Sequence, residues 1–215
     1  MREPDTIPIM NSITRPGVRV LRADAAANRQ RLLDAAAELF AKESVTAVHM
    51  EQIARLAGVG KGTLYRHFQG KGDLALALLE EVFTTFQNEA LAQMRCDVSA
   101  GTAWLEQLAL FLSNFAAFME THMTLMCEIQ RGGVDDLNSP APYAWLHITI
   151  RNLLQMAAAA GECSTDLDIP VLADMLLAPV TAQFYRFLRE QRSYAPERIN
   201  ANLQTMVFSL GKRSF

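Results

Sequence analysis

The helical spacing of apolar residues constrains the fold of this chain more than any other feature. From Ala25 onward, hydrophobic side chains recur every three or four residues, which places them on one face of an α-helix. No segment shows the two-residue alternation, bounded by turn residues, that is typical of a β-strand. We therefore expect an all-α fold of about nine helices, over residues 25–42, 51–57, 61–67, 73–95, 105–119, 122–131, 140–160, 168–192 and 196–212.

Glycine and proline mark the ends of several of these helices. Gly132 and Gly133 stop the helix over 122–131, and Pro140 opens the next one. Pro179 lies inside the apolar pattern of residues 168–192. We expect a kink there, because proline lacks the backbone N–H that a helix interior needs.

The composition argues against a membrane protein and a disulfide-rich one. Half of the 215 residues are hydrophobic and a fifth are charged, as in ordinary globular domains. No apolar run approaches the roughly 18 residues that cross a bilayer, and the first residues lack the apolar core of a signal peptide. Three widely spaced cysteines (Cys96, Cys127, Cys163) fit reduced thiols, with redox sensing as the alternative. We expect a cytoplasmic protein with no membrane partner, cofactor or metal.

Charge is divided unevenly along the chain. The formal net charge of -3 argues by itself against a nucleic-acid binder. Residues 1–72, however, hold eleven Lys and Arg against seven Asp and Glu, or +4, whereas residues 73–215 hold nine against sixteen, or -7. A basic module on an acidic body keeps a nucleic-acid-binding surface localised.

Residues 1–24 have the pattern of a flexible basic arm. Prolines and a glycine interrupt regular structure there, and the last part carries Arg15, Arg19 and Arg22. Such an arm is either a solvated tail or a segment that follows phosphates or enters a minor groove. We place a DNA-binding domain at 25–72 and a second helical domain at 73–215.

Residues 50–68, MEQIARLAGVGKGTLYRHF, predict two short helices joined by a tight turn. The first stops at Gly58, since a residue without a Cβ takes the left-handed conformation that ends a helix. Val59 fills the corner of the turn, and the second helix packs inward through Leu64 and Phe68. Two helices crossing steeply through a glycine turn form a helix-turn-helix.

The outer face of the second helix is rich in groups that bind phosphates and base edges. A solvated basic face of a plain helical bundle is the alternative. Gly62 keeps the first turn slim, so that backbone amides can approach a phosphate. The expected DNA-binding residues are Lys61, Gly62, Thr63, Tyr65, Arg66, His67 and Lys71.

The motif resembles the DNA-binding domain of the TetR family of transcriptional regulators over about residues 27–80. It reads x-x-I-A-x-x-A, then G-V-x-x-G-T-L-Y-x-H-F and K-x-x-L, which covers Ile53 to Leu74. The resemblance implies a dimer, a palindromic operator, and carboxy-terminal helices that hold a ligand pocket and the dimer interface. It places Thr63, Tyr65 and His67 against DNA and Lys71 on a phosphate.

Two positions depart from the family pattern. His49 stands where Ser or Thr often caps the first helix of the motif, and Gly60 stands where Ser or Thr commonly precedes the lysine. One hydroxyl contact to phosphate is therefore missing. Glycine is still an acceptable N-cap, so the helix should form.

The second domain is rich in soft and aromatic side chains, which suits a pocket for a hydrophobic or amphipathic small molecule. Plain core packing is the alternative for each of them. His147, with Arg151 one turn on, could hold an anionic head group. The candidate ligand-binding residues are Phe111, Phe115, Phe118, Met119, Met123, Met126, Trp145, His147, Met156 and Phe184.

These observations favour a ligand-responsive repressor that an effector releases from its operator. The resemblance to the TetR family also implies that the last two helices pair with their copies across a two-fold axis. The alternative is a DNA-organising or division-control protein of the same fold without an effector. An enzyme is a third class, but the sequence shows no nucleophile–base pairing, metal spacing or phosphate loop.

Overall fold

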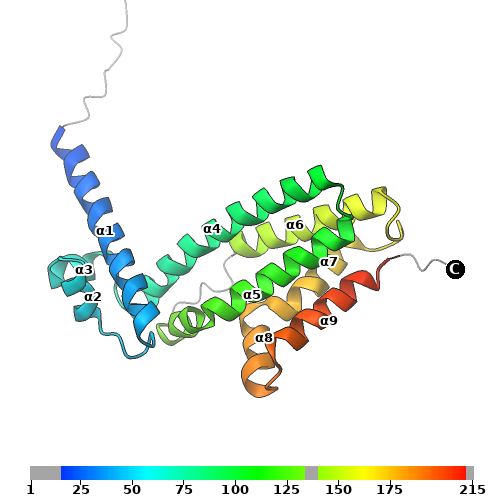
Figure 1. Ribbon diagram of the computed structural model, residues 1–215. Coiled ribbons are helices and arrows are strands. Elements are labelled where there is room, and N and C mark those ends of the chain that lie inside the picture. The colour runs from blue at the N-terminus through cyan, green and yellow to red at the C-terminus, as the bar shows by residue number, and fades with distance from the viewer. Residues whose placement is uncertain (1–15, 134–139, 212–215) are drawn as a thin grey trace, which may run out of the picture.

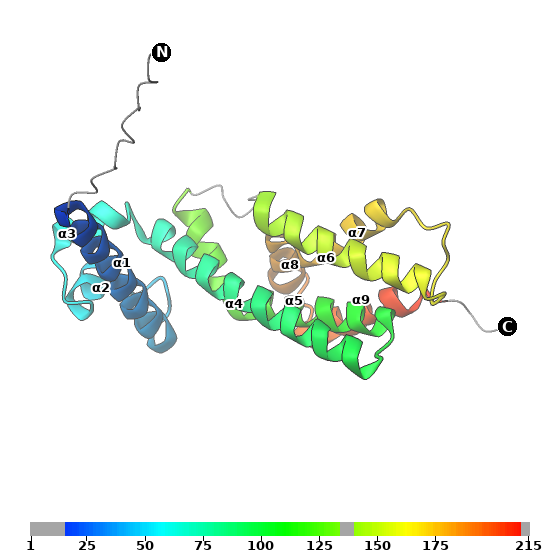
Figure 2. The ribbon, with the colours of Figure 1, turned by 90° about the horizontal axis from the view of Figure 1, so that it is seen from above.

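The computed structural model describes residues 16–133 and 140–211, and these residues form two helical parts (Figure 1). Three helices make a small amino-terminal module, and six more make a larger body. Figure 2 shows the two parts side by side from above. The all-α prediction is confirmed. The helices are α1 (Pro16–Lys42), α2 (Met50–Leu56), α3 (Lys61–His67), α4 (Lys71–Ala100), α5 (Trp104–Arg131), α6 (Pro140–Ala159), α7 (Ile169–Leu177), α8 (Ala182–Arg186) and α9 (Pro196–Phe208).

The module has its own core. Leu32 and Leu33 of α1, Ile53 of α2 and Leu64 of α3 are fully buried in one cluster. Burial of each such side chain contributes about 1.5–3 kcal/mol, so these contacts hold the three helices together although α2 and α3 have only seven residues each. Near the end of α5, residues 125 and 129 belong to the same cluster. The module is therefore packed onto the body as well as linked to it.

Helix α1 begins earlier than the sequence pattern indicated. Residues 16–24, which we expected in the loose arm, are its first turns. Pro16 suits the first position of a helix, where its missing N–H has no partner to lose, and neither Pro nor Gly follows Gly17 before Lys42. Residues 1–15, the rest of the expected arm, lie outside the described residues.

Helix α5 is one continuous helix, so the prediction of two helices over 105–119 and 122–131 was wrong. Nothing between Met119 and His122 breaks a helix, and the hydroxyl of Thr121 donates to the carbonyl of Ala117, 2.9 Å away. The apolar face of the helix continues beyond this point as far as Ile129. Helix α4 likewise extends further than expected, to a left-handed cap at residue 101.

The expected kink at Pro179 is a full interruption. Helix α7 gives way to a 3₁₀ turn (Ala178–Val180), and α8 is followed by a π-helical turn (Phe187–Gln191). After this break, Arg189 Nε lies 2.7 Å from Glu120 Oε2, and the Tyr185 hydroxyl donates to the same carboxylate at 3.1 Å. Both contacts fasten the interrupted segment to α5.

The body is built around α5, which lies between α4, α6 and α9 (Figures 1 and 2). Its core contains a cluster of aromatic rings in which Phe86 has its centroid 5.1 Å from that of Phe118 and 6.3 Å from that of Trp145. The only bridge of β type in the described residues joins Cys163 to Gly211. None of the helices in the described ranges is long and apolar enough to cross a membrane.

Candidate DNA-binding face and ligand pocket

The turn between α2 and α3 has the geometry that the sequence predicted. Gly58 has a φ of 65°, and the N–H of Val59 donates to the carbonyl of Ala54 at 3.0 Å. Gly60 is the N-cap of α3, and its carbonyl accepts from the N–H groups of residues 63 and 64. The backbone alone thus starts α3, and no hydroxyl at position 60 is needed for folding.

The other departure from the family pattern, His49, is also accommodated. Its backbone N–H, at the start of α2, donates to Gln52 Oε1 at 2.6 Å. A side chain three residues into a helix commonly satisfies the cap in this way. The first helix of the motif therefore forms without Ser or Thr at its cap.

Helix α3 has two distinct faces. Leu64 is fully buried, whereas the side on which Lys61, Gly62, Tyr65 and Arg66 lie is exposed. Residues 63 and 67 are half-buried at the boundary between these faces. The exposed face therefore holds four of the seven predicted DNA-binding residues.

An ion pair crosses the motif on this exposed side. Lys61 Nζ lies 2.8 Å from Glu51 Oε1 on α2 and 5.7 Å from the centroid of the Tyr65 ring. The hydrogen bond between the two side chains lowers the pKa of Glu51 and raises the pKa of Lys61. Both side chains are exposed, so the pair exchanges readily with other charges.

His67 and Lys71 differ from the other predicted residues. The Nε2 atom of His67 is buried, without a hydrogen-bond partner in the described part of the chain. Lys71 Nζ donates to the carbonyls of Val45 and Thr46, at 2.9 and 3.1 Å, and lies 3.9 Å from Glu128 Oε1. Its side chain is only 19% exposed. Lys71 therefore joins α4 both to the loop after α1 and to α5.

The same junction brings two backbones almost into contact. A Cβ atom added to Gly132, at the end of α5, would lie 2.8 Å from the Cα of Gly72 on α4. Real Cβ atoms essentially never approach so closely. Two residues without side chains therefore permit the end of α5 to lie against the start of α4.

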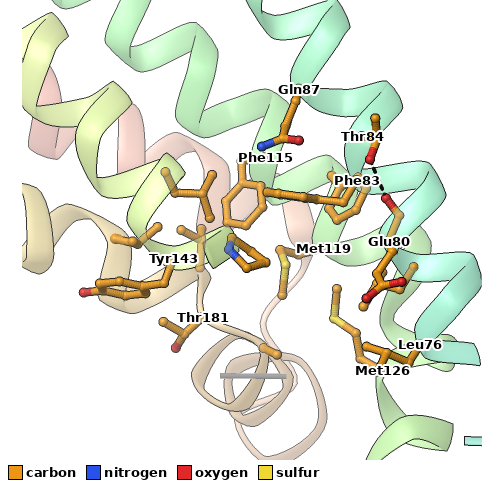
Figure 3. Close-up of a pocket in the computed structure, with 17 residues that line it drawn as sticks. Leu76, Glu80, Phe83, Thr84, Gln87, Phe115, Met119, Met126, Tyr143 and Thr181 are labelled. Atoms are coloured by element: carbon orange, nitrogen blue, oxygen red, sulfur yellow. Dashed lines mark hydrogen bonds between the residues drawn. The ribbon is translucent and has the colours of Figure 1, made fainter. Parts of the chain in front are cut away.

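The body contains a cavity of about 450 Å³ between α4, α5, α6 and the segment around Pro179. Figure 3 shows its walls, with Glu80, Phe83 and Gln87 along α4 and Phe115 and Met119 on α5. The residues that line it are Leu76, Leu79, Glu80, Phe83, Thr84, Gln87, Phe115, Phe118, Met119, Met126, Pro142, Tyr143, Leu146, Leu177, Val180, Thr181 and Ala182.

The structure brings four of the ten predicted ligand-binding residues to this cavity. Two others, Phe111 and Trp145, pack in the aromatic cluster of the body core, and Met123 borders a separate space of about 10 Å³. Met156 and Phe184 are exposed at the surface. The four that line the cavity are Phe115, Phe118, Met119 and Met126.

His147 also lies outside the cavity, with its Nε2 3.3 Å from Asp174 Oδ1 and 3.3 Å from the carbonyl of Pro170. Neither His147 nor Arg151 lines the cavity, so the structure does not support them as its anionic-head site. A helical face on its own does not tell whether a residue meets a void, a neighbouring ring or solvent.

Sequence reasoning missed the wall that α4 contributes. None of the predicted ligand-binding residues lies on this helix, yet six of the lining residues do, from Leu76 to Gln87. Leu76, Glu80, Phe83 and Gln87 recur at helical spacing, as core residues do. Only the placement of α4 against α5 shows that they face a cavity.

Two helices connect the cavity with the module. Leu79 of α4 lines the cavity and packs against both hydrophobic clusters. On α5, Met126 lines the cavity, while its neighbours Leu125 and Ile129 are buried in the core of the module. These two helices therefore form a continuous packed path from the cavity to the core of the module.

The fold and the exposed face of α3 define a helix-turn-helix protein. Residues 32–78 match the family model described as bacterial regulatory proteins, tetR family. Over 177 residues the chain is 42% identical to the HTH-type transcriptional regulator SAR2658 of Staphylococcus aureus (strain MRSA252), a match that covers 82% of this chain and 90% of the relative. The chain belongs to the TetR family of transcriptional regulators.

A second relative matches over a shorter stretch of sequence, and a solved structure matches in fold. The chain spans about a third (36%) of the length of the HTH-type transcriptional regulator SAB2452 of S. aureus (strain bovine RF122 / ET3-1), at 44% identity over 66 residues, 31% of this chain. A putative TetR-family transcriptional regulator from Rhodococcus sp. is 20% identical, with a TM-score of 0.58, over 87% of this chain and 100% of that one.

Proposed function

We propose that this chain is a dimeric repressor that binds a palindromic operator and is released by a hydrophobic or amphipathic small molecule. The observation that carries the proposal is the division of α3 into a fully buried face at Leu64 and an exposed face with Lys61, Tyr65 and Arg66. A helix held from behind in this way can enter the major groove with its outer face toward the bases.

In this proposal the exposed residues divide the work of recognition. Lys61 and Arg66 bind phosphates or base acceptors, Tyr65 contacts the groove, and Gly62 allows the backbone to approach a phosphate. The residue at position 63 contributes from the edge of the face. Lys71 already has two carbonyl partners, so we assign to it the anchoring of α4 in place of a phosphate contact.

The proposed dimer uses the last two helical segments. Phe184 and Phe187 lie exposed around α8, and Met206 and Phe208 lie exposed on α9, which leaves apolar surface for a second copy. A two-fold dimer places two α3 helices about one DNA turn, roughly 34–36 Å, apart. The operator would then be a palindrome.

The proposed release works through the helices that border the cavity. A volume of about 450 Å³ is large enough for a small-molecule ligand. Displacement of Met126 or Leu79 by such a ligand would move the packing of Leu125 and Ile129 in the module. The two α3 helices would then lose the spacing that the operator requires.

Selection of bound DNA from a random pool tests the DNA-binding part of the proposal. A palindrome should be recovered, and its binding should weaken steeply with salt, because phosphate contacts release counterions. Recovery of sequences without a shared palindrome, or a flat response to salt, would count against the docking of two α3 helices.

The variant Tyr65→Ala sharpens this test. It should weaken operator binding by roughly tenfold, since one good contact at a base is worth about 1–3 kcal/mol. Leu91→Ala, at a similarly exposed position on α4, is the matched control and should bind as the parent does. If Tyr65→Ala and Leu91→Ala bound the operator with equal affinity, Tyr65 would not contact DNA.

A panel of hydrophobic compounds, added to the operator complex, tests the effector. At least one should release the DNA while leaving the dimer intact. If none of the compounds changes operator binding, the result favours the alternative, a DNA-organising or division-control protein without an effector, over the repressor.

A further inference from the structure

The described lining of the cavity carries a single acidic side chain and no basic one. Among its described lining residues, Glu80 is the only one with a carboxylate, and none is Lys, Arg or His. The side chain of Glu80 is exposed, so it lies where the cavity meets solvent. Figure 3 shows it on the same wall as Phe83, Thr84 and Gln87.

Three other acidic side chains that lie on or against α5 are occupied by partners. Glu120 is paired with Arg189 at 2.7 Å, and Glu128 lies 3.5 Å from Arg131. Glu162 accepts from the backbone N–H groups of residues 104 and 105, both at 2.8 Å. For Glu80, by contrast, the structure shows no ion pair or side-chain hydrogen bond with any side chain or backbone group of residues 24–133 and 142–211.

Basic groups close to the cavity are directed elsewhere. Arg186 donates to Gln130 and lies 3.8 Å from Glu190. His122 packs with its ring centroid 4.5 Å from that of Phe118, and burial, which disfavours its charged form, lowers its pKa below the usual value. The carboxylate of Glu80 is therefore available to pair with a cationic group of a ligand.

Aromatic rings add to the attraction for a positive charge. Phe83, one turn from Glu80, lines the cavity beside Phe118, with ring centroids 5.8 Å apart. The face of an aromatic ring carries partial negative charge and attracts a cation within about 6 Å. Methionines on α5, which adapt to different apolar shapes, complete the lining for an apolar body.

We infer that the cavity selects an amphipathic cation: a quaternary ammonium or protonated amine on an apolar body, with its charge at Glu80 and its body between Phe83 and Met119. This inference rests on the proposed function, since it names the class of effector for the same cavity. A carboxylate or phosphate ligand would meet uncompensated repulsion at Glu80.

Three probes with the same chain length separate charge from apolar burial. Dodecyltrimethylammonium and dodecanoate are titrated below their micellar concentrations, and dodecanol below its solubility limit, into the full chain without DNA. Trp145 reports binding through its fluorescence, because its ring centroid lies 5.9 Å from that of Phe83. The cation should bind roughly tenfold more tightly than the alcohol, and dodecanoate more weakly than both.

Variants test whether the preference for the cationic probe depends on the carboxylate of Glu80. Glu80→Gln should remove the advantage of the cation over the alcohol, and Glu80→Lys should transfer it to dodecanoate. Glu89→Gln removes the same charge from an exposed position of α4 outside the cavity and should leave the preference intact. Phe83→Leu keeps an apolar side chain without the ring and should weaken binding of the cation more than of the alcohol.

The outcomes distinguish this inference from the proposed function. A cation that binds no more tightly than dodecanol, or a preference that survives Glu80→Gln, overturns the inference. Release of operator DNA is measured separately with the same probes. If the cation binds through Glu80 but leaves DNA binding unchanged, the inference stands and the repressor mechanism fails.

Discussion

The core of the module and the wall of the cavity in the body bury their apolar residues to different extents. Around α3, Leu32, Ile53 and Leu64 are fully buried in one small core. In the body, Leu79 and Phe83 are only half-buried, because they face a cavity of about 450 Å³. The difference suits the two tasks that we propose: a fixed surface that reads DNA, and walls with space between them that can adapt to a small molecule.

The largest effect is expected from breaking the small core. Leu64→Ala should lower the free energy of unfolding by about 2–5 kcal/mol, because it leaves a cavity among three helices. Leu56→Ala on α2, where the side chain is 46% exposed, should change it by less than about 0.5 kcal/mol. Denaturant unfolding measures both, and similar losses would contradict a tightly packed module.

A middle-sized effect is expected at the junction of the two regions. Lys71→Ala removes the donor to Val45 and Thr46 and should lower the free energy of unfolding by about 1–3 kcal/mol. Lys61→Ala should leave stability unchanged and weaken operator binding directly. Thermal unfolding and DNA affinity, measured on both variants, distinguish the structural role of Lys71 from the DNA-binding role of Lys61. If Lys71→Ala kept full stability, Lys71 would again be a candidate for a phosphate contact.

The smallest effect is expected at the exposed ion pair. Glu51→Gln frees Lys61 for phosphate and should raise DNA affinity roughly two- to fivefold, as measured by titration of operator DNA. The pKa of Glu51 is lowered in the folded chain. Its pair with Lys61 is therefore fully formed at any pH above the pKa that the Glu51 carboxyl has in the unfolded chain, and it is lost as the pH falls through the lowered pKa of the folded chain. The variant should therefore gain affinity at neutral pH.

Glu38→Gln is the control for that measurement. Glu38 forms a similar exposed pair with Lys42, at 2.6 Å, and its loss changes the charge of the module by the same amount. An equal rise in affinity for both variants would attribute the effect to net charge and not to the release of Lys61.

The module could be predicted from sequence because its signals are local. Gly58, the apolar spacing around Leu64 and the residues between Lys61 and Phe68 all lie within one short segment. The carbonyl contacts of Lys71 could not be predicted, because its partners are the backbone groups of residues 45 and 46, which any residue type supplies.

The cavity was only partly predictable for a related reason. Phe115 and Met119 follow the same helical spacing as Phe111, and all three pack in the core of the body, yet only the first two also face the cavity. Which side of a helix meets empty space depends on how far neighbouring helices stand apart. That distance is a property of the whole body, and no single segment encodes it.

The contact between Gly72 and Gly132 has a consequence for how variants of this protein would behave. Gly132 has a φ of -69°, so an alanine fits its backbone conformation, but its methyl group would collide with the Cα of Gly72. Gly132→Ala would thus push the end of α5 away from the start of α4 in every molecule at all times. Such a chain would carry, without any small molecule, a permanent displacement at the junction where the end of α5 lies against the start of α4.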